Sequence, residues 1–239
     1  MSDCWICGAQ ADSGEHKIKK TDLQRAVSGT VNQKSPIYHR VSGIKKRPIG
    51  SLKAEALKFE KSICATCNGS LTQPHDYSWN ILSSYLADNV IEVGKEIDLI
   101  NVFEGDIEEN VLNVHLFFCK IFGCAVLDAK LELDLSNLAN SIRTQSSCSD
   151  LYIKIRRSNN GKSSSYCALS DLQVFTLEGG GMKYVHLFYT VGNYSVDIVY
   201  STDIAGLDLT DYFKPNGAIA KVVIGSVEYN QEYSAQTTS

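Results

Sequence analysis

Two short segments, Cys4-Trp-Ile-Cys7 and Cys64-Ala-Thr-Cys67, decide the fold of the first third of this chain. Each pair closes a tight knuckle, and two knuckles supply the four thiolates of a tetrahedral Zn²⁺ site, with Zn–S bonds of about 2.3 Å. A zinc ribbon usually separates its pairs by about 15–20 residues, whereas 56 residues lie between Cys7 and Cys64. This spacing predicts a treble-clef module, in which a β-hairpin lies between the first knuckle and a helix that begins at the second. Such a closed structural zinc contributes about 10–16 kcal/mol to folding.

The use of cysteine predicts a reducing compartment. The chain has eight cysteines, and no signal peptide fits, because Cys4 arrives before an apolar signal segment could form. We therefore expect a cytoplasmic protein whose paired thiols bind metal rather than each other. The four cysteines without knuckle spacing are expected to be buried core thiols: Cys119, Cys124, Cys148 and Cys167.

The longest apolar run extends from Val111 to Leu127 and is interrupted by polar residues such as Lys120. At 17 residues it is too short and too polar to span a bilayer. The sequence therefore predicts a buried helix here and no association with a membrane.

Charge is divided unevenly along the chain. Residues 1–75 hold 12 Lys and Arg against 6 Asp and Glu, whereas residues 76–239 hold 11 against 21. A balance of +6 followed by one of −10 is typical of a protein whose first lobe alone faces a polyanion. We therefore expect a polyanion, such as nucleic acid, as a partner of the first lobe. A solvated basic face on a small zinc domain would give the same count.

The predicted fold class is α+β, with a zinc module over residues 1–75, an α+β domain over 76–230 and a disordered tail over 231–239. Within the module we expect a short strand over 15–20, a helix over 23–27, loop over 28–50 and a strand over 51–63. The second domain is expected to begin with helices and end in a mainly antiparallel β region. The predicted helices are 74–88, 107–127 and 134–145, and the predicted strands are 151–155, 172–177, 184–191, 194–200 and 220–227. Gly192-Asn193 is a predicted hairpin turn.

Three pieces of the module, in this order, resemble the HNH endonuclease family. They are the first knuckle, the Glu15-His16-x-Ile18 segment, and the second knuckle running directly into Asn68. The match is to the zinc-stapled branch that includes phage Holliday-junction resolvases, and it covers roughly residues 4–80. In this branch an acid-His pair and a Cys-Asn pair share one ββα-metal site. The family more often has Asp where Glu15 stands.

The resemblance implies a hydrolase that cuts phosphodiester bonds in DNA, and in RNA as well if the site accepts it. His16 would be the general base, because imidazole titrates near neutral pH. Asn68 and Glu15 would offer oxygen ligands to a catalytic Mg²⁺ or Mn²⁺ that is separate from the structural zinc. The implied nucleic-acid contacts are Lys17, Lys19, Lys20, Lys45, Lys46 and Arg47.

Several assignments stay open at this point. Neighbouring residues of a regular strand point to opposite faces, so Glu15 and His16 reach one metal only at a strand end or twist. Asn32 and His39 are both available as the middle residue of the motif, and His75 competes with Asn68. A non-catalytic zinc module that binds nucleic acid is the alternative function, and a zinc-stapled protein scaffold is a third. The acidic half could bind a protein partner, self-associate or restrain the nuclease.

Overall fold

The computed structural model describes residues 2–27, 29–40, 46–158, 166–179, 181–213, 215 and 221–227. Its helices are α1 (Lys20–Ala26), α2 (Gln73–Asp88), α3 (Ile107–Asp128) and α4 (Ser136–Thr144). Its strands are β1 (Ile37–His39), β2 (Arg47–Ile49), β3 (Glu96–Asp98), β4 (Leu151–Ser158), β5 (Cys167–Leu169), β6 (Gln173–Thr176), β7 (Met182–Val191), β8 (Tyr194–Tyr200), β9 (Lys221–Val223) and β10 (Gly225–Val227). This mixture confirms the α+β class.

The main sheet has the strand order β10-β4-β8-β7-β5, and β6 also pairs with β7. All of its pairings are antiparallel except that of β10 with β4. The predicted hairpin turn is confirmed, because Val191 pairs with Tyr194 across Gly192, whose φ of +58° suits glycine. The strands predicted over 151–155, 172–177, 184–191 and 194–200 are present. The one strand expected over 220–227 is instead two short strands, β9 and β10, which belong to different sheets. Among the described residues of this half, the three-residue strands β3 and β5 were not predicted.

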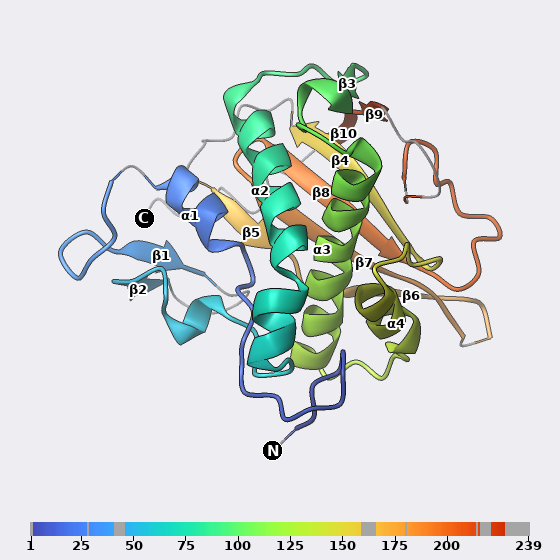
Figure 1. Ribbon diagram of the computed structural model, residues 1–239, viewed down its shortest axis with the longest axis horizontal. Helices are drawn as coiled ribbons and strands as arrows, with labels where there is room; N and C mark the ends of the chain where they lie inside the picture. Colours follow the sequence, from blue (N-terminus) through green and yellow to red (C-terminus); the bar gives the residue numbers. More distant parts are fainter. Residues whose placement is uncertain are drawn as a thin grey trace.

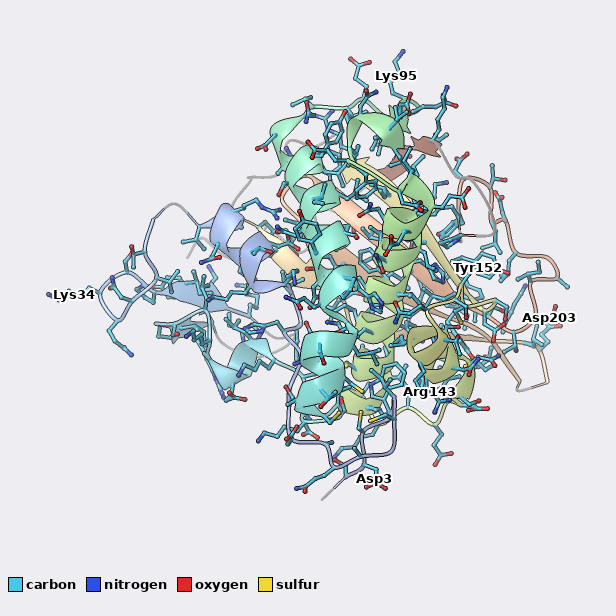
Figure 2. The ribbon with its side chains drawn as sticks, in the orientation of Figure 1. Asp3, Lys34, Lys95, Arg143, Tyr152 and Asp203 are labelled. Carbon is cyan, nitrogen blue, oxygen red and sulfur yellow. The ribbon has the colours of Figure 1, made fainter. Side chains whose placement is uncertain are left out.

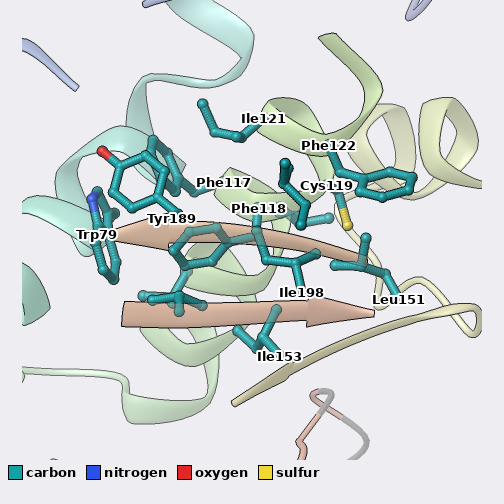
Figure 3. Packing of buried hydrophobic residues seen from close by; sticks show 14 of the residues in the cluster. Trp79, Phe117, Phe118, Cys119, Ile121, Phe122, Leu151, Ile153, Tyr189 and Ile198 are labelled. Carbon is teal, nitrogen blue, oxygen red and sulfur yellow. The ribbon is translucent and has the colours of Figure 1, made fainter. Parts of the chain in front are cut away.

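Helices α2 and α3 lie side by side across one face of the main sheet (Figure 1). An aromatic cluster fills the space between the two layers (Figure 3). Trp79 from α2 stacks on Phe117 from α3 at 5.5 Å between ring centroids, and its edge meets Tyr189 of β7 at 5.6 Å. Edge-to-face and offset contacts of this kind stabilise a core beyond the area that they bury. The layers are therefore held in one fixed arrangement.

Helix α3 is the central element of the core. It begins at a good cap, because the Asp106 side chain accepts a hydrogen bond from the backbone N–H of Glu109 at 3.0 Å. By length and composition it could cross a membrane, and no other helix in the described residues could, but 83% of its most apolar window is buried inside the structure. The prediction of a buried helix over 107–127 is confirmed.

The N-terminal segment shares this core instead of forming a separate one. Ile6, Phe59 and Ile63 belong to the same cluster of buried side chains as Trp79 and Phe117. The predicted domain boundary at residue 75 falls inside α2, which serves both halves. The N-terminal segment is therefore packed onto the α+β body and shares its core.

Two buried polar groups lock the N-terminal segment to that body. Asp22 of α1 is fully buried and accepts hydrogen bonds from Trp79 Nε1 at 2.9 Å and from the Tyr189 hydroxyl at 2.7 Å. Lys120 of α3 is also fully buried, and its Nζ lies 3.1 Å from Glu15 and 3.0 Å from Asp76. These carboxylates outweigh the effect of burial and raise the pKa of Lys120.

The segment between the knuckles differs from the sequence prediction. The loop expected over 28–50 contains the antiparallel hairpin β1–β2, in which Ile37 pairs with Ile49. In place of the strands expected over 51–63 and 15–20, the structure has a 3-10 turn at Glu55–Leu57 and isolated bridges such as that of His16 with Lys58. Apolar residues of this segment, such as Leu57, Phe59 and Ile63, are buried in the shared core. Their spacing therefore reflects packing against the body and does not indicate an extended strand. The predicted tail over 231–239 lies outside the described residues.

Replacing Lys120 by Met should destabilise the protein by about 3–5 kcal/mol, because it leaves the buried Glu15 carboxylate without its partner. The matched control is Lys95→Met at an exposed lysine, which should change stability by less than about 0.5 kcal/mol. Urea unfolding measures both. In the double variant Glu15→Gln with Lys120→Met, the loss should be smaller than the sum of the two single losses. Equal stabilities for the Lys120 and Lys95 variants would show that the buried ion pair is unimportant.

Candidate metal centre

The first knuckle is a tight turn that brings its two cysteines together. The backbone N–H of Cys4 donates to Ala9 O at 2.6 Å, and the N–H of Gly8 donates to Cys4 O at 2.8 Å. Gly8 has a φ of +77°, a conformation that glycine adopts without the steric cost of a Cβ. Gly8, which follows the second cysteine of the knuckle, therefore allows the chain to make this tight turn.

The second knuckle leads directly into a helix. The backbone N–H of Cys67 points at Cys64 Sγ, 3.3 Å away, and the N–H of Asn68 donates to Cys64 O at 2.9 Å. A π-helical turn, Cys67–Leu71, then continues into α2. The backbone N–H of Trp5 donates to Ser62 O at 3.1 Å, so the two knuckles are also held together by their main chains.

The four knuckle sulfurs meet at one point, and sulfur atoms are seen gathered beside Asp3 (Figure 2). The ligand atoms of Cys4, Cys7, Cys64 and Cys67 all lie within 4.8 Å of one another, and those of Cys7 and Cys64 are 3.7 Å apart. A tetrahedral site with Zn–S bonds of 2.3 Å would place its sulfurs about 3.8 Å apart. The cluster is therefore compatible with a structural zinc site whose four positions are all filled by the protein.

Without a metal, the site favours the protonated form of Cys67. Burial, together with hydrogen bonds from Cys67 to the neighbouring sulfurs, raises the pKa of Cys67 well above its ordinary value. A divalent cation bound at the centre would favour the thiolate form instead, because thiol ligands lose their protons to the metal that they bind. Cys7 is the exposed member of the cluster, and the other three are buried.

His16 lies at the surface of the segment that follows the first knuckle. Its Nε2 is 3.0 Å from the backbone oxygen of Leu52, and its backbone forms a bridge with Lys58. A carbonyl oxygen only accepts hydrogen bonds, so this contact requires the proton on Nε2. The contact therefore fixes the ring orientation and leaves Nδ1 with its lone pair.

Glu15 and Asn68 have different partners. Only 7% of Glu15 is exposed, and its carboxylate is ion-paired with Lys120 in the core. The structure therefore does not place Glu15 as a ligand of a hydrated cation, because the carboxylate points inward. Asn68 is partly exposed, and its Nδ2 donates to Ser13 Oγ at 2.8 Å, so its Oδ1 is the group left to bind a cation.

Two of the six basic residues expected to contact nucleic acid are engaged with acids. Lys17 forms an ion pair with Asp128 at 2.7 Å, and Lys19 forms one with Asp76 at 3.1 Å. Three more of the expected contacts lie in the described part of the chain: Lys20, Lys46 and Arg47. They form no ion pair with a described residue. Lys45 lies outside the described residues.

The structure also shows the contacts of the three residues that the sequence left as alternatives for the site: Asn32, His39 and His75. Asn32 Oδ1 accepts from the backbone N–H groups of Lys34 and Ser35, which makes it part of a local turn. His75 is fully buried, with Nε2 at 2.9 Å from Gln145 Oε1, and is a core residue. His39 is half-buried on β1 and pairs across the hairpin with Arg47.

The contacts that position these groups are not visible as a sequence motif. Leu52 acts through its backbone oxygen, which any residue would supply. Ser13 acts through one hydroxyl, and Lys120 is one polar residue within an apolar run. Only Lys120 carried a signal, because a lone charge inside a buried helix requires a partner.

Comparisons with protein-family models, with curated proteins and with solved structures return no match for this chain. The resemblance to HNH endonucleases rests on the residues quoted from the sequence.

We predict that the purified protein holds one zinc ion per chain and that Cys64→Ser loses it. The reason is that one missing thiolate opens a four-sulfur site, and the zinc affinity contributes directly to folding. Metal analysis and thermal unfolding measure both effects. The control is Cys167→Ala, which removes a partly buried cysteine outside the cluster and should keep the zinc. Equal zinc content in the two variants would exclude this site.

Proposed function

We propose that this chain is a metal-dependent endonuclease of the HNH type, built on a treble-clef zinc module. The observation that carries the proposal is the hydrogen bond between His16 Nε2 and Leu52 O, on the segment that follows the first zinc knuckle. It holds an imidazole in one tautomer at a partly exposed position. The supporting observations are the four-cysteine cluster and the excess of positive charge over residues 1–75.

In the proposed reaction, Nδ1 of His16 accepts a proton from water as its oxygen attacks the scissile phosphorus. The bond from phosphorus to one sugar oxygen then breaks, and that oxygen takes up a proton from the solvent. The carbonyl of Leu52 stabilises the imidazolium that forms, because the N–H that it accepts becomes a stronger donor. General-base catalysis of this kind contributes about 10²–10⁴-fold to the rate.

A bound divalent cation would supply stabilisation of the charge that builds on the leaving oxygen. Asn68 is the residue proposed to hold it, through Oδ1, since Nδ2 is occupied by Ser13. Glu15 is not included, because its carboxylate is paired with Lys120. One amide oxygen leaves the remaining positions of a Mg²⁺ or Mn²⁺ ion to water and substrate phosphate, which suits an ion that retains most of its hydration.

The acidic body supports the N-terminal segment, since the helical turn Cys67–Leu71 leads from the second knuckle into α2, which packs on α3. We propose that this body also provides the surface for a protein partner or a second copy of the chain. Its excess of acidic residues makes it a poor surface for nucleic acid.

A second candidate function is a zinc module that binds nucleic acid without cutting it. The observation that favours it is the internal ion pair of Glu15, which removes the one carboxylate expected beside His16. In that case His16 would be a structural hydrogen-bond donor to Leu52.

The two functions are separated by plasmid nicking in Mg²⁺ or Mn²⁺. The parent protein should convert supercoiled plasmid to open circles, and His16→Ala should reduce the rate by at least about 10²-fold. The matched variant is His16→Gln, whose side-chain amide retains a donor for Leu52 O but has no basic nitrogen, so it should be equally inactive. Zinc content and melting temperature must equal those of the parent.

Undiminished nicking by both variants would exclude His16 as the base. Salt-dependent binding without nicking in either metal would support the adaptor function instead.

A further inference from the structure

A groove lies on the N-terminal segment, and its lining includes the two residues that follow His16 in the sequence. It has a volume of about 570 Å³, within the range typical of ligand sites, and it lies between α1, β1 and β5. Its floor is apolar, because it includes the buried side chains of Ile18, Leu23 and Leu57. The body of the protein contributes β5, so the groove exists only where the two halves meet.

Two tyrosines line this groove and remain open to solvent. Tyr38 of β1 is 65% exposed, and Tyr166, next to β5, is 43% exposed. Large exposed aromatic rings beside an apolar floor form a surface on which a flat ring can stack. Base–aromatic stacking tolerates any sequence, because every nucleobase has a π-face.

The rim of the same groove is cationic. Arg40 lines it, is exposed and forms no ion pair with a described residue. His39 lines it as well, and the pKa of this imidazole is lowered first by burial and then by the charges of Lys17 and Arg47. Arg40, Lys17 and Arg47 therefore place positive charge near this side of the groove, although Lys17 is paired with Asp128. A ligand with an aromatic ring and a negative charge matches both the lining and the rim.

The groove is also continuous with the proposed catalytic residue. Lys17 and Ile18, the two residues after His16, both line it. The backbone N–H of Lys17 donates to Leu57 O at 2.9 Å, so the residue after His16 is joined directly to the groove wall. A nucleotide in the groove would therefore bring its flanking phosphate next to the His16 segment.

We propose that this groove binds an unpaired nucleobase, which stacks on Tyr38 while Arg40 holds a neighbouring phosphate. The inference rests on the proposed function for its orientation, and it names the substrate class: single-stranded or locally unpaired nucleic acid. A base inside a duplex is stacked between its neighbours, so only an unpaired base can enter.

The test is binding, measured by fluorescence anisotropy with the zinc-loaded full chain in buffer without Mg²⁺ or Mn²⁺. The probes are a labelled single-stranded DNA, the same strand in a perfect duplex, and an RNA of the same sequence. Tyr38→Ala should weaken single-strand binding by about tenfold, the loss expected for one base–aromatic stack. Tyr38→Phe should retain the affinity, because it keeps the ring.

Tyr77→Ala is the matched control, since Tyr77 is also 65% exposed but lies on α2 and does not line the groove. It should change binding by less than about twofold. Arg40→Gln should weaken binding and lower its dependence on salt. Equal affinities for duplex and single strand, or equal effects of the Tyr38 and Tyr77 variants, would overturn the proposal.

Because no cleavage is measured, this test is independent of the nicking assay. If the protein does not nick DNA but its binding depends on Tyr38, the result would support the groove proposal and contradict the nuclease proposal. If the protein nicks DNA but Tyr38→Ala leaves binding unchanged, the result would support the nuclease proposal and contradict the groove proposal. The DNA and RNA probes show which sugar the groove accepts.

Discussion

The convergence of four thiols is the constraint on which the rest of the N-terminal segment depends. Two knuckles far apart in sequence meet with Cys7 and Cys64 sulfurs 3.7 Å apart, and the chain between them becomes a closed loop. In its described residues that segment has the seven-residue helix α1, a hairpin of two three-residue strands, one 3-10 turn and isolated bridges, so its regular secondary structure is short. Closing the loop therefore determines where His16 lies relative to Asn68.

A second constraint joins this loop to the α+β body. The fully buried Lys120 binds Glu15, and the fully buried Asp22 binds Trp79 and Tyr189. Buried charges are tolerated only when they are paired and hydrogen-bonded, so these contacts select one docking arrangement. The same arrangement brings β5 against α1 and thereby forms the groove. A positive segment on a negative body is thus one structural unit.

Sequence patterns predicted the regular body well and the zinc segment only in outline. Helix α3 and strand β8 were predicted because they bury long apolar runs, and the hairpin turn at Gly192 was predicted from turn chemistry. The knuckles follow from cysteine spacing alone. The inward direction of Glu15 and the Leu52 contact of His16 depend on partners 105 and 36 residues away. Pairings of that range leave no local pattern, because they are decided by how the loop packs on the body.

We propose that a sulfur-bound zinc organises the loop that carries His16, and X-ray absorption at the zinc edge of the purified protein can test this. We expect a first shell of sulfur alone, with four scatterers at about 2.3 Å. A shell containing nitrogen or oxygen, or protein free of zinc, would contradict it.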